Sequence, residues 1–480
     1  MNKKLLCFLL GRAAPMIGAA QLFPLIYAFF DREPCRYILF WPPLIAFAVG
    51  AALLVYGRKH KERVLIPEAA LFILLLWWLS ILLGMLPYAL TGWLAPTDAL
   101  FQAAADCSTT GIILLPPEAP FSLYLWHTIL GWIGGAIFLT MLVTMIPLAG
   151  GCFGLMLSFR RGLVFSTMVG QTDELAKQVM GVYLWLTAFA AIIYMGVGLN
   201  PGEAIILSML SVSTTGGDTS YFMSEPFFPA LKFAIALVLF LTCGNFLRYW
   251  RTFRRRDWRD YYSNREIRSF TLIIVVLMII MFIHLIITDI YNVFTNFHYV
   301  VFYALSFAST AGFVDVETMT WPDLELFLLL FMALVGGCIG SPTGGLKAIR
   351  FITLWKLIGA EIKRTLHPHM MSGIVIGGEA VPADVCGRML AFFFLYTCAI
   401  FAYILMLTAA GGSLSESVGL AVSSFTGLGA MNGLYSLETI IGLPTWAKIG
   451  SSFFMILGRM EIFAFLVLVE HVRWQRDKKW

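Results

Sequence analysis

Long apolar runs alternate with short polar connections along the whole 480-residue chain. Each run approaches the length of about 20 residues that an α-helix needs to cross the hydrocarbon core of a bilayer. The runs predict ten membrane spans, at residues 5–30, 38–56, 67–90, 121–148, 178–199, 227–247, 269–290, 323–346, 386–410 and 446–470. No polar stretch is long enough for a separate soluble domain. The pattern therefore indicates an all-α integral membrane protein.

Four of the polar connections contain the same kind of segment. Each is a semi-apolar stretch of about three helical turns, too short to span a membrane but long enough to enter it and turn back. Aligned on a final glycine, the copies read FQAAADCSTTG to Gly111, ILSMLSVSTTG to Gly216, FYALSFASTAG to Gly312 and GLAVSSFTGLG to Gly429. A capped surface loop would explain one copy. Repetition at regular spacing instead indicates a repeated architecture.

The composition of these segments suits a site for a small cation. Non-helical backbone at membrane depth is tolerated only where it is buried in protein or lines a wet cavity. Four copies that converge on one axis meet this demand together, because rings of their carbonyl groups replace the hydration shell of a monovalent cation. The copies share one topology, whereas several secondary transporters have inverted repeats. A pore is favoured, and a secondary transporter of organic solutes is the alternative from another class.

Charged residues make up only 13% of the chain, against about a quarter in soluble domains, and their distribution is uneven. Basic residues gather in four segments, at 57–63, 248–268, 347–364 and 473–479. Four windows contain no lysine or arginine but hold twelve acids; they are 91–121, 199–229, 289–323 and 411–445. The positive-inside rule places the basic segments and both termini in the cytoplasm. The acidic windows then face outward, where they are expected to attract cations.

Several other local patterns in the sequence do not indicate a functional site. The basic, apolar start imitates a signal peptide, but the run continues to Phe30 and Arg12 interrupts it, so we expect a retained helix. The eight cysteines include no CxxC pair and indicate neither a disulfide framework nor a metal site. No HExxH or GxSxG motif is present, so an enzyme is not expected, nor is an organic cofactor or a nucleic-acid partner.

Four motifs carry a resemblance to a known family. They are LGWIGGAIFLTMLVTMIP (Leu130–Pro147), LTCGNFLRYW (Leu241–Trp250), GGCIGSPTGGLKAIR (Gly336–Arg350) and LGRMEIF (Leu457–Phe463). With these motifs, the chain resembles the TrkH-type subunit of the Trk/Ktr/HKT superfamily of potassium transporters, over essentially its whole length. The fourth repeated copy departs from the family pattern and reads TGLGAMNG.

The resemblance implies two leading helices and four helix–pore loop–helix repeats in a pseudo-fourfold arrangement around a central pore. The units would be 1–60, 61–160, 161–262, 263–365 and 366–480. The implied function is potassium uptake across the bacterial inner membrane, with potassium as the transported ion. The family forms homodimers and is gated by a cytoplasmic nucleotide-binding ring. A sodium-coupled Ktr-type transporter, which shares the pore, is the alternative.

Carried over by position, the resemblance gives two groups of site residues. The potassium filter would be Thr109, Thr110, Gly111, Thr214, Thr215, Gly216, Thr310, Ala311, Gly312, Gly427, Leu428 and Gly429. The gate would be an intramembrane loop with Gly336, Gly337, Gly340, Ser341, Gly344 and Gly345, together with Arg459. Lys347 and Arg350 would mark the cytoplasmic exit and anchor a helix end.

Charges inside or beside the spans support part of this interpretation. Arg459 lies 13 residues past Trp446, about 20 Å along a helix, and a charge at that depth is expected to face the bundle interior. A structural arginine satisfied by loop carbonyls is the alternative. Asp106 is expected to cap or brace its pore helix rather than bind an ion. Asp218 either recruits cations or braces its loop, and the arginine-rich 248–268 segment contacts anionic lipid or a regulatory partner.

Overall fold

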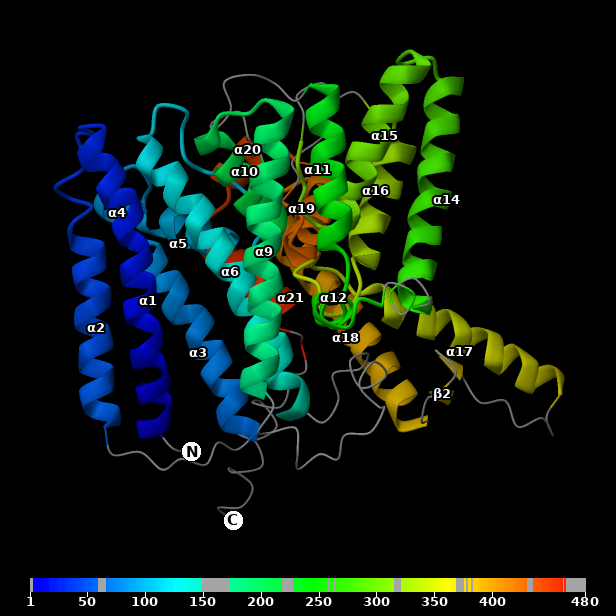
Figure 1. Cartoon of the computed structure of the whole chain (residues 1–480), viewed down its shortest axis with the longest axis horizontal. Helices are drawn as coiled ribbons and strands as arrows, with labels where there is room; N and C mark the ends of the chain where they lie inside the picture. Colours follow the sequence, from blue (N-terminus) through cyan, green and yellow to red (C-terminus); the bar gives the residue numbers. More distant parts are fainter. Residues whose placement is uncertain are drawn as a thin grey trace.

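The computed structural model describes most of the chain as helices (Figure 1). The described residues are 3–58, 66–148, 172–217, 228–257, 259, 261, 264–314, 321–367, 375–376, 379–380, 383–429, 435–460 and 462. Two leading helices, α1 (Lys3–Phe30) and α2 (Trp41–Gly57), pack against each other. Their contact is close, since a Cβ on Gly57 would lie 2.5 Å from the backbone nitrogen of Phe8.

Four groups of helices follow, each with a short helix enclosed by longer ones. The first contains α3 (Ile66–Gly84), α4 (Leu86–Leu90), α5 (Pro96–Cys107) and α6 (Phe121–Leu148). The second contains α9 (Thr172–Val197), α10 (Pro201–Ser213), α11 (Pro229–Thr242) and α12 (Phe246–Arg255). The third contains α14 (Arg265–Ile287), α15 (Val293–Ala308), α16 (Asp323–Val335) and α17 (Ala348–Leu366). The fourth contains α18 (Ala383–Ala409), α19 (Leu414–Thr426), α20 (Leu437–Ile441) and α21 (Thr445–Arg459).

The four groups close into a ring. Helix α10 packs on α6, α15 on α11, α19 on α16, and α21 of the last group packs on α5 of the first. Each group therefore touches the next, and the fourth returns to the first. This is the predicted pseudo-fourfold, all-α architecture. A two-stranded hairpin of β1 (Val375–Ile376) and β2 (Glu379–Ala380) is its small β element.

The short helices are built to begin abruptly inside the bundle. Proline opens α5 and α10, where its missing N–H costs nothing, and the side chains of Asn292 and Ser413 cap α15 and α19. With 12 to 16 residues, these helices are about 18 to 24 Å long, less than the hydrocarbon thickness of about 30 Å. They therefore enter the membrane without crossing it, as predicted.

Helices lie at all ten predicted spans, although the tenth, 446–470, lies outside the described residues at 461 and from 463 onward; two predictions were wrong in detail. Among the described residues, six helices are long and apolar enough to cross a membrane, or seven if the bent pair α11–α12 counts as one. That pair corrects the predicted continuous span 227–247, because the chain turns by 89° between Thr242 and Phe246. The 248–268 segment, expected to be a loop, begins within α12 and ends within α14.

Candidate functional site

The segments that follow the four short helices share one backbone pattern. We call Thr109–Gly111, Thr214–Gly216, Thr310–Gly312 and Gly427–Gly429 together the central ring. The first residue of each has a left-handed φ, of 55°, 61°, 59° and 77°, and so does its last glycine, with 76°, 53°, 67° and 63°. A left-handed threonine is uncommon and costs about 1–3 kcal/mol. Its recurrence at one position in three copies shows that the fold imposes this geometry.

Glycine–carbonyl contacts form three of the four links between neighbouring copies of the central ring. A Cβ on Gly111 would lie 1.9 Å from the carbonyl oxygen of Thr215, and one on Gly216 would lie 1.7 Å from that of Ala311. A Cβ on Gly429 would lie 1.5 Å from the carbonyl oxygen of Thr110. These equivalent contacts run from the first copy to the second, the second to the third and the fourth to the first. Only glycine fits at these positions, and each accommodates a carbonyl of the adjacent copy.

The threonine hydroxyl groups of the ring do not all have the same role. Thr110 and Thr215 each pair with a serine two residues earlier, at 2.7 Å between the hydroxyl oxygens, so these side chains stiffen their own segment. The hydroxyl of Thr109 is buried and has no hydrogen-bond partner among the described residues. An oxygen in that condition is suited to a cation.

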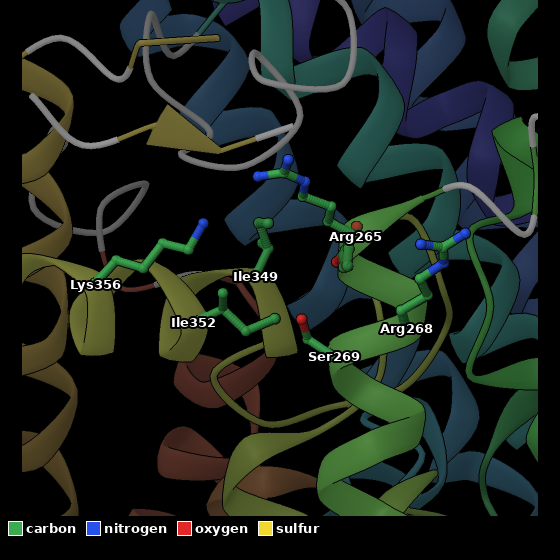
Figure 2. Close-up of a pocket in the computed structure, with 7 residues that line it drawn as sticks. Arg265, Arg268, Ser269, Ile349, Ile352 and Lys356 are labelled. Carbon is green, nitrogen blue, oxygen red and sulfur yellow. The ribbon is translucent and has the colours of Figure 1, made fainter. Parts of the chain in front are cut away.

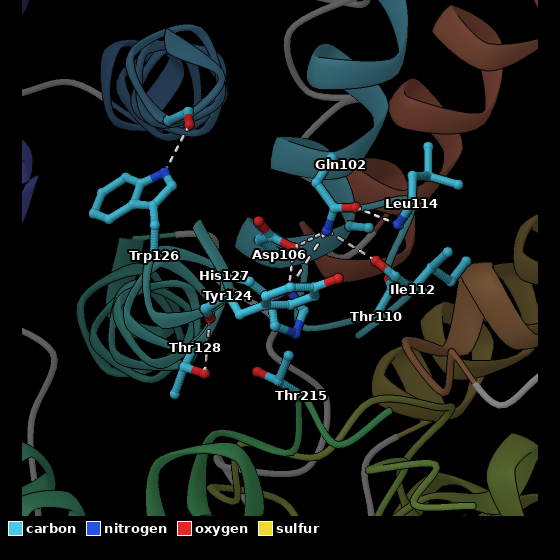
Figure 3. A network of polar contacts seen from close by, with 12 residues as sticks. Gln102, Asp106, Thr110, Ile112, Leu114, Tyr124, Trp126, His127, Thr128 and Thr215 are labelled. Atoms are coloured by element: carbon cyan, nitrogen blue, oxygen red, sulfur yellow. Dashed lines mark hydrogen bonds and ion pairs between the residues drawn. The ribbon is translucent and has the colours of Figure 1, made fainter. Parts of the chain in front are cut away.

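A buried network of hydrogen bonds supports the first copy (Figure 3). Asp106 accepts hydrogen bonds from Tyr88 at 2.6 Å and Gln102 at 2.7 Å, and its Oδ1 lies 2.7 Å from Nδ1 of His127. Gln102 also donates to the carbonyl of Ile112 and accepts from the backbone N–H of Leu114. The carboxylate thus holds the short helix to its surroundings. Gln102 was not among the residues predicted from the sequence, although its i,i+4 spacing from Asp106 was a usable signal.

A non-helical loop, Gly336–Lys347, lies against the base of the ring; we call it the basal loop. Gly344 donates its N–H to the hydroxyl of Thr310 at 2.7 Å, and a Cβ on Gly344 would lie 1.7 Å from the carbonyl oxygen of Thr426. The hydroxyl of Thr214 donates to the carbonyl of Pro342 at 3.4 Å. The predicted gate glycines therefore lie on a loop that touches the second, third and fourth copies.

Arg459 adds the missing contact with the first copy. Its Nε donates to the carbonyl of Ser108 at 2.5 Å and its Nη1 to the carbonyl of Pro342 at 2.8 Å. The side chain is only 2% exposed, and its guanidinium lies 4.9 Å from the ring centre of Phe138. Both expectations for this residue hold in part, since it faces the interior and is satisfied by loop carbonyls.

The arginine also explains the departure of the fourth copy. Where the other copies have threonine, this one has Gly427, and a Cβ there would lie 3.1 Å from Nη2 of Arg459. A threonine side chain would extend further into the guanidinium. The glycine therefore makes room for the charge.

Lys347 holds the basal loop in shape. Its ammonium, at the end of a side chain that is 2% exposed, donates to the carbonyls of Ser341 and Thr343 and to the hydroxyl of Thr343. It was expected to anchor a helix end, and instead it folds the loop upon itself. Arg350 lies in the first turn of α17 with its guanidinium 4.3 Å from the ring centre of Phe392.

Two further elements hold the far side of the basal loop. At the α11–α12 break, the carbonyl of Cys243 accepts the N–H of Cys338 at 2.9 Å, and Phe246 donates its N–H to the carbonyl of Gly340 at 3.2 Å. From α14, Glu266 accepts the N–H of Ile339 at 2.7 Å and is 4% exposed. Sequence reasoning missed both attachments.

The acids of the outward windows do not all remain available to cations. Asp98 forms an ion pair with Lys448 at 2.6 Å, which corrects the expectation for this residue. Glu416 accepts hydrogen bonds from the hydroxyls of Thr439 and Ser413, and these bonds lower the pKa of its carboxyl. Asp218 and three further acids of these windows, Glu225, Asp315 and Glu317, lie outside the described residues.

Comparisons with known proteins agree with this geometry. A family model described as TrkH, a cation transport protein, matches residues 44–476. The Trk system potassium uptake protein TrkH of Halomonas elongata is 28% identical over 99% of this chain and 100% of its own, and that of Escherichia coli K12 is 26% identical over the same shares. The crystal structure of the potassium transporter TrkH from Vibrio parahaemolyticus superimposes with a TM-score of 0.88 at 24% identity, covering 98% of each chain.

Proposed function

The chain belongs to the TrkH family of cation transport proteins, and on that premise we propose that it carries potassium ions into the cell across the bacterial inner membrane. The observation that carries the proposal is the glycine–carbonyl contact, repeated with one sense in three of the four links of the central ring, within four helix groups that close on themselves. Backbone carbonyls in such a ring substitute for the water around a potassium ion. The names of its relatives as potassium uptake proteins also support this assignment.

We assign closure of the pathway to the basal loop and Arg459. The loop contacts the second, third and fourth copies, and Arg459 bridges it to the first. A cation leaving the ring would meet this loop and a buried positive charge, so conduction requires the loop to move aside. Such a movement leaves the hydrogen bonds that hold the first copy in place, because the network around Asp106 does not include the loop.

The orientation in the proposal follows from charge. The arginine-rich helix α12 and the basic helix α17 lie toward the end of the bundle where α1 begins (Figure 1). Under the positive-inside rule this end is cytoplasmic, and both termini belong there. We include a homodimer and a cytoplasmic nucleotide-binding ring as the regulatory partner, on the strength of the family resemblance.

The ring assignment is tested at Gly216. A side chain at this position meets the carbonyl of Ala311 and requires a left-handed φ of 53°, and overpacking of this kind costs about 1–3 kcal/mol or more. We expect Gly216→Ser to reduce potassium uptake by at least about tenfold in a potassium-uptake-deficient host. Gly202→Ala is the matched control, because nothing lies within 4 Å of its new methyl group. Equal uptake by both variants would refute the carbonyl ring.

Two bilayer measurements test the rest of the proposal. Recordings with and without sodium distinguish a potassium channel from a sodium-coupled transporter, since only the latter needs sodium for its potassium current. Deletion of Cys338–Thr343 removes the part of the basal loop beneath the ring and is expected to raise the open probability. Unaltered gating in that variant would contradict the role of the loop.

A further inference from the structure

A cavity with a partly charged lining lies between the start of α14 and α17 (Figure 2). Its volume is about 190 Å³, and its charged lining consists of Arg265, Arg268, Lys356 and Glu266. The remaining lining residues are Ser269, Ile349 and Ile352. At about 30 Å³ per water, the cavity has room for a phosphate group and a few waters.

The electrostatics of the cavity favour an anion. Three basic residues and one acidic residue line it, and the carboxylate of that acid already accepts the N–H of Ile339. The first turn of α14 adds the positive end of its helix dipole, a 23-residue helix that begins at Arg265. Figure 2 shows the side chains of Arg265 and Lys356 extending to the same side of the cavity from two different helices. They are therefore placed to contact one bound group.

Helix α17 places this cavity at the surface of the bilayer. Four large apolar side chains lie on one face of the helix and are strongly exposed: Trp355 (73%), Ile358 (55%), Ile362 (55%) and Leu366 (70%). Lys356 flanks this face, and Lys363 and Arg364 follow in the last turn. In Figure 1 the helix projects sideways from the end of the bundle. Exposed apolar residues beside basic ones are typical of helices that lie in the membrane interface.

We propose that the cavity binds the phosphate group of an anionic phospholipid. The apolar face of α17 would contact the acyl chains, and Arg265 and Lys356 would receive the headgroup, with Arg268 adding positive charge nearby, as basic pockets between helices at the cytoplasmic surface do. Glu266 lines the cavity and holds Ile339 of the basal loop, so the occupied cavity communicates with that loop. This last consequence rests on the proposed function, whereas the binding itself does not.

The test is a titration of the purified full-length protein in a neutral detergent. Short-chain phosphatidylglycerol, phosphatidylcholine of the same chain length and inorganic phosphate are added separately, and the thermal unfolding midpoint is measured. A ligand of the folded state raises the midpoint saturably. We expect this for phosphatidylglycerol and not for phosphatidylcholine. The variant R265Q/R268Q/K356Q should bind about 100-fold more weakly, from about fivefold per cation.

The matched control is R254Q/R255Q/R256Q, which removes the same charge from exposed positions at the end of α12, outside the cavity. It should respond as the unaltered protein does, and R265Q alone, the mildest change, should lose about fivefold. A saturable response to inorganic phosphate, lost in the cavity variant and not exceeded by phosphatidylglycerol, would support a phosphate site in the cavity. It would show that the ligand is a soluble phosphate and would overturn the assignment to a phospholipid.

Two further outcomes overturn the proposal. They are an equal response of the two triple variants to phosphatidylglycerol, and the lack of any saturable response in the unaltered protein. Potassium flux into phosphatidylglycerol and phosphatidylcholine liposomes is measured in parallel. A lack of flux in both lipids would count against the proposed function, while the binding result would stand by itself.

Discussion

Replacement of Arg459 by methionine tests whether this residue keeps the basal loop in place. The guanidinium makes two hydrogen bonds, to Ser108 at 2.5 Å and to Pro342 at 2.8 Å. Only the bond to Pro342 joins it to the loop, so only that bond breaks when the loop moves. A hydrogen bond from a charged donor contributes about 1.5–3 kcal/mol. Its loss shifts the ratio of open to closed states by about 10- to 100-fold.

The measurement is the single-channel open probability in planar bilayers with potassium on both sides. Methionine has a similar length and no charge, and because it leaves the carbonyls of Ser108 and Pro342 without this donor, at a cost of about 1–3 kcal/mol each, the thermal unfolding midpoint of the variant is measured beside the recordings. Arg254→Met, at an exposed position of α12, is the control for loss of an arginine. An open probability within about twofold of the unaltered protein in Arg459→Met would refute the bridge, since the expected shift is at least tenfold.

Arg459→Lys separates the bridge from the charge. A lysine ammonium keeps the positive charge but lacks the planar fork that reaches two carbonyls at once. If the bridge closes the pathway, the lysine variant opens as readily as the methionine variant. If the charge alone limits the exit of cations, the lysine variant instead keeps the original conductance and open probability.

Three further substitutions are expected to separate the parts of the site. Glu266→Ala removes the acceptor for the N–H of Ile339 and should raise the open probability by about tenfold or more, whereas Glu266→Gln, which keeps an acceptor, should have a smaller effect in the same recordings. Asp106→Asn should lower the thermal unfolding midpoint, because an amide NH₂ replaces one carboxylate oxygen and leaves a buried donor, Tyr88 or Gln102, without its acceptor, at a cost of about 1–3 kcal/mol; an unchanged midpoint would contradict the brace. Gly427→Thr should abolish potassium uptake, since the new side chain collides with Arg459, and normal uptake would show that the guanidinium has other room.

The predictable part of this molecule is the part that repeats. Hydrophobic runs and four copies of one segment are visible along the chain, and both survive in the ten helical positions and the closed ring. The equivalence of Gly111, Gly216 and Gly429 was predictable for the same reason, because each copy supports the interpretation of the others. A property that the copies share can be recognised in the sequence because the same residues recur in each copy.

The attachments of the basal loop were not predictable, because each joins residues that are remote in sequence and occurs once. Glu266 reaches Ile339 across 73 positions, and Arg459 reaches Pro342 across 117. The break between α11 and α12 rests on a single glycine and asparagine in an otherwise apolar run. No local period signals such a break, and the bond from Cys338 to the freed carbonyl of Cys243 stabilises it only in the folded chain.

Gly427, which replaces the threonine in the fourth copy, connects the repeated ring with the attachments of the basal loop. Three copies present threonine at the base of the ring, and two of those hydroxyls contact the basal loop directly. The fourth presents Gly427 and leaves that space to Arg459, which reaches the loop from a different helix. A fully symmetric ring would offer the loop only hydroxyls, whose hydrogen bonds contribute about 1 kcal/mol each. Giving up one threonine for a guanidinium exchanges a weak contact for a charged one, so the asymmetry of the sequence is what allows a firm closure beneath a nearly symmetric ring.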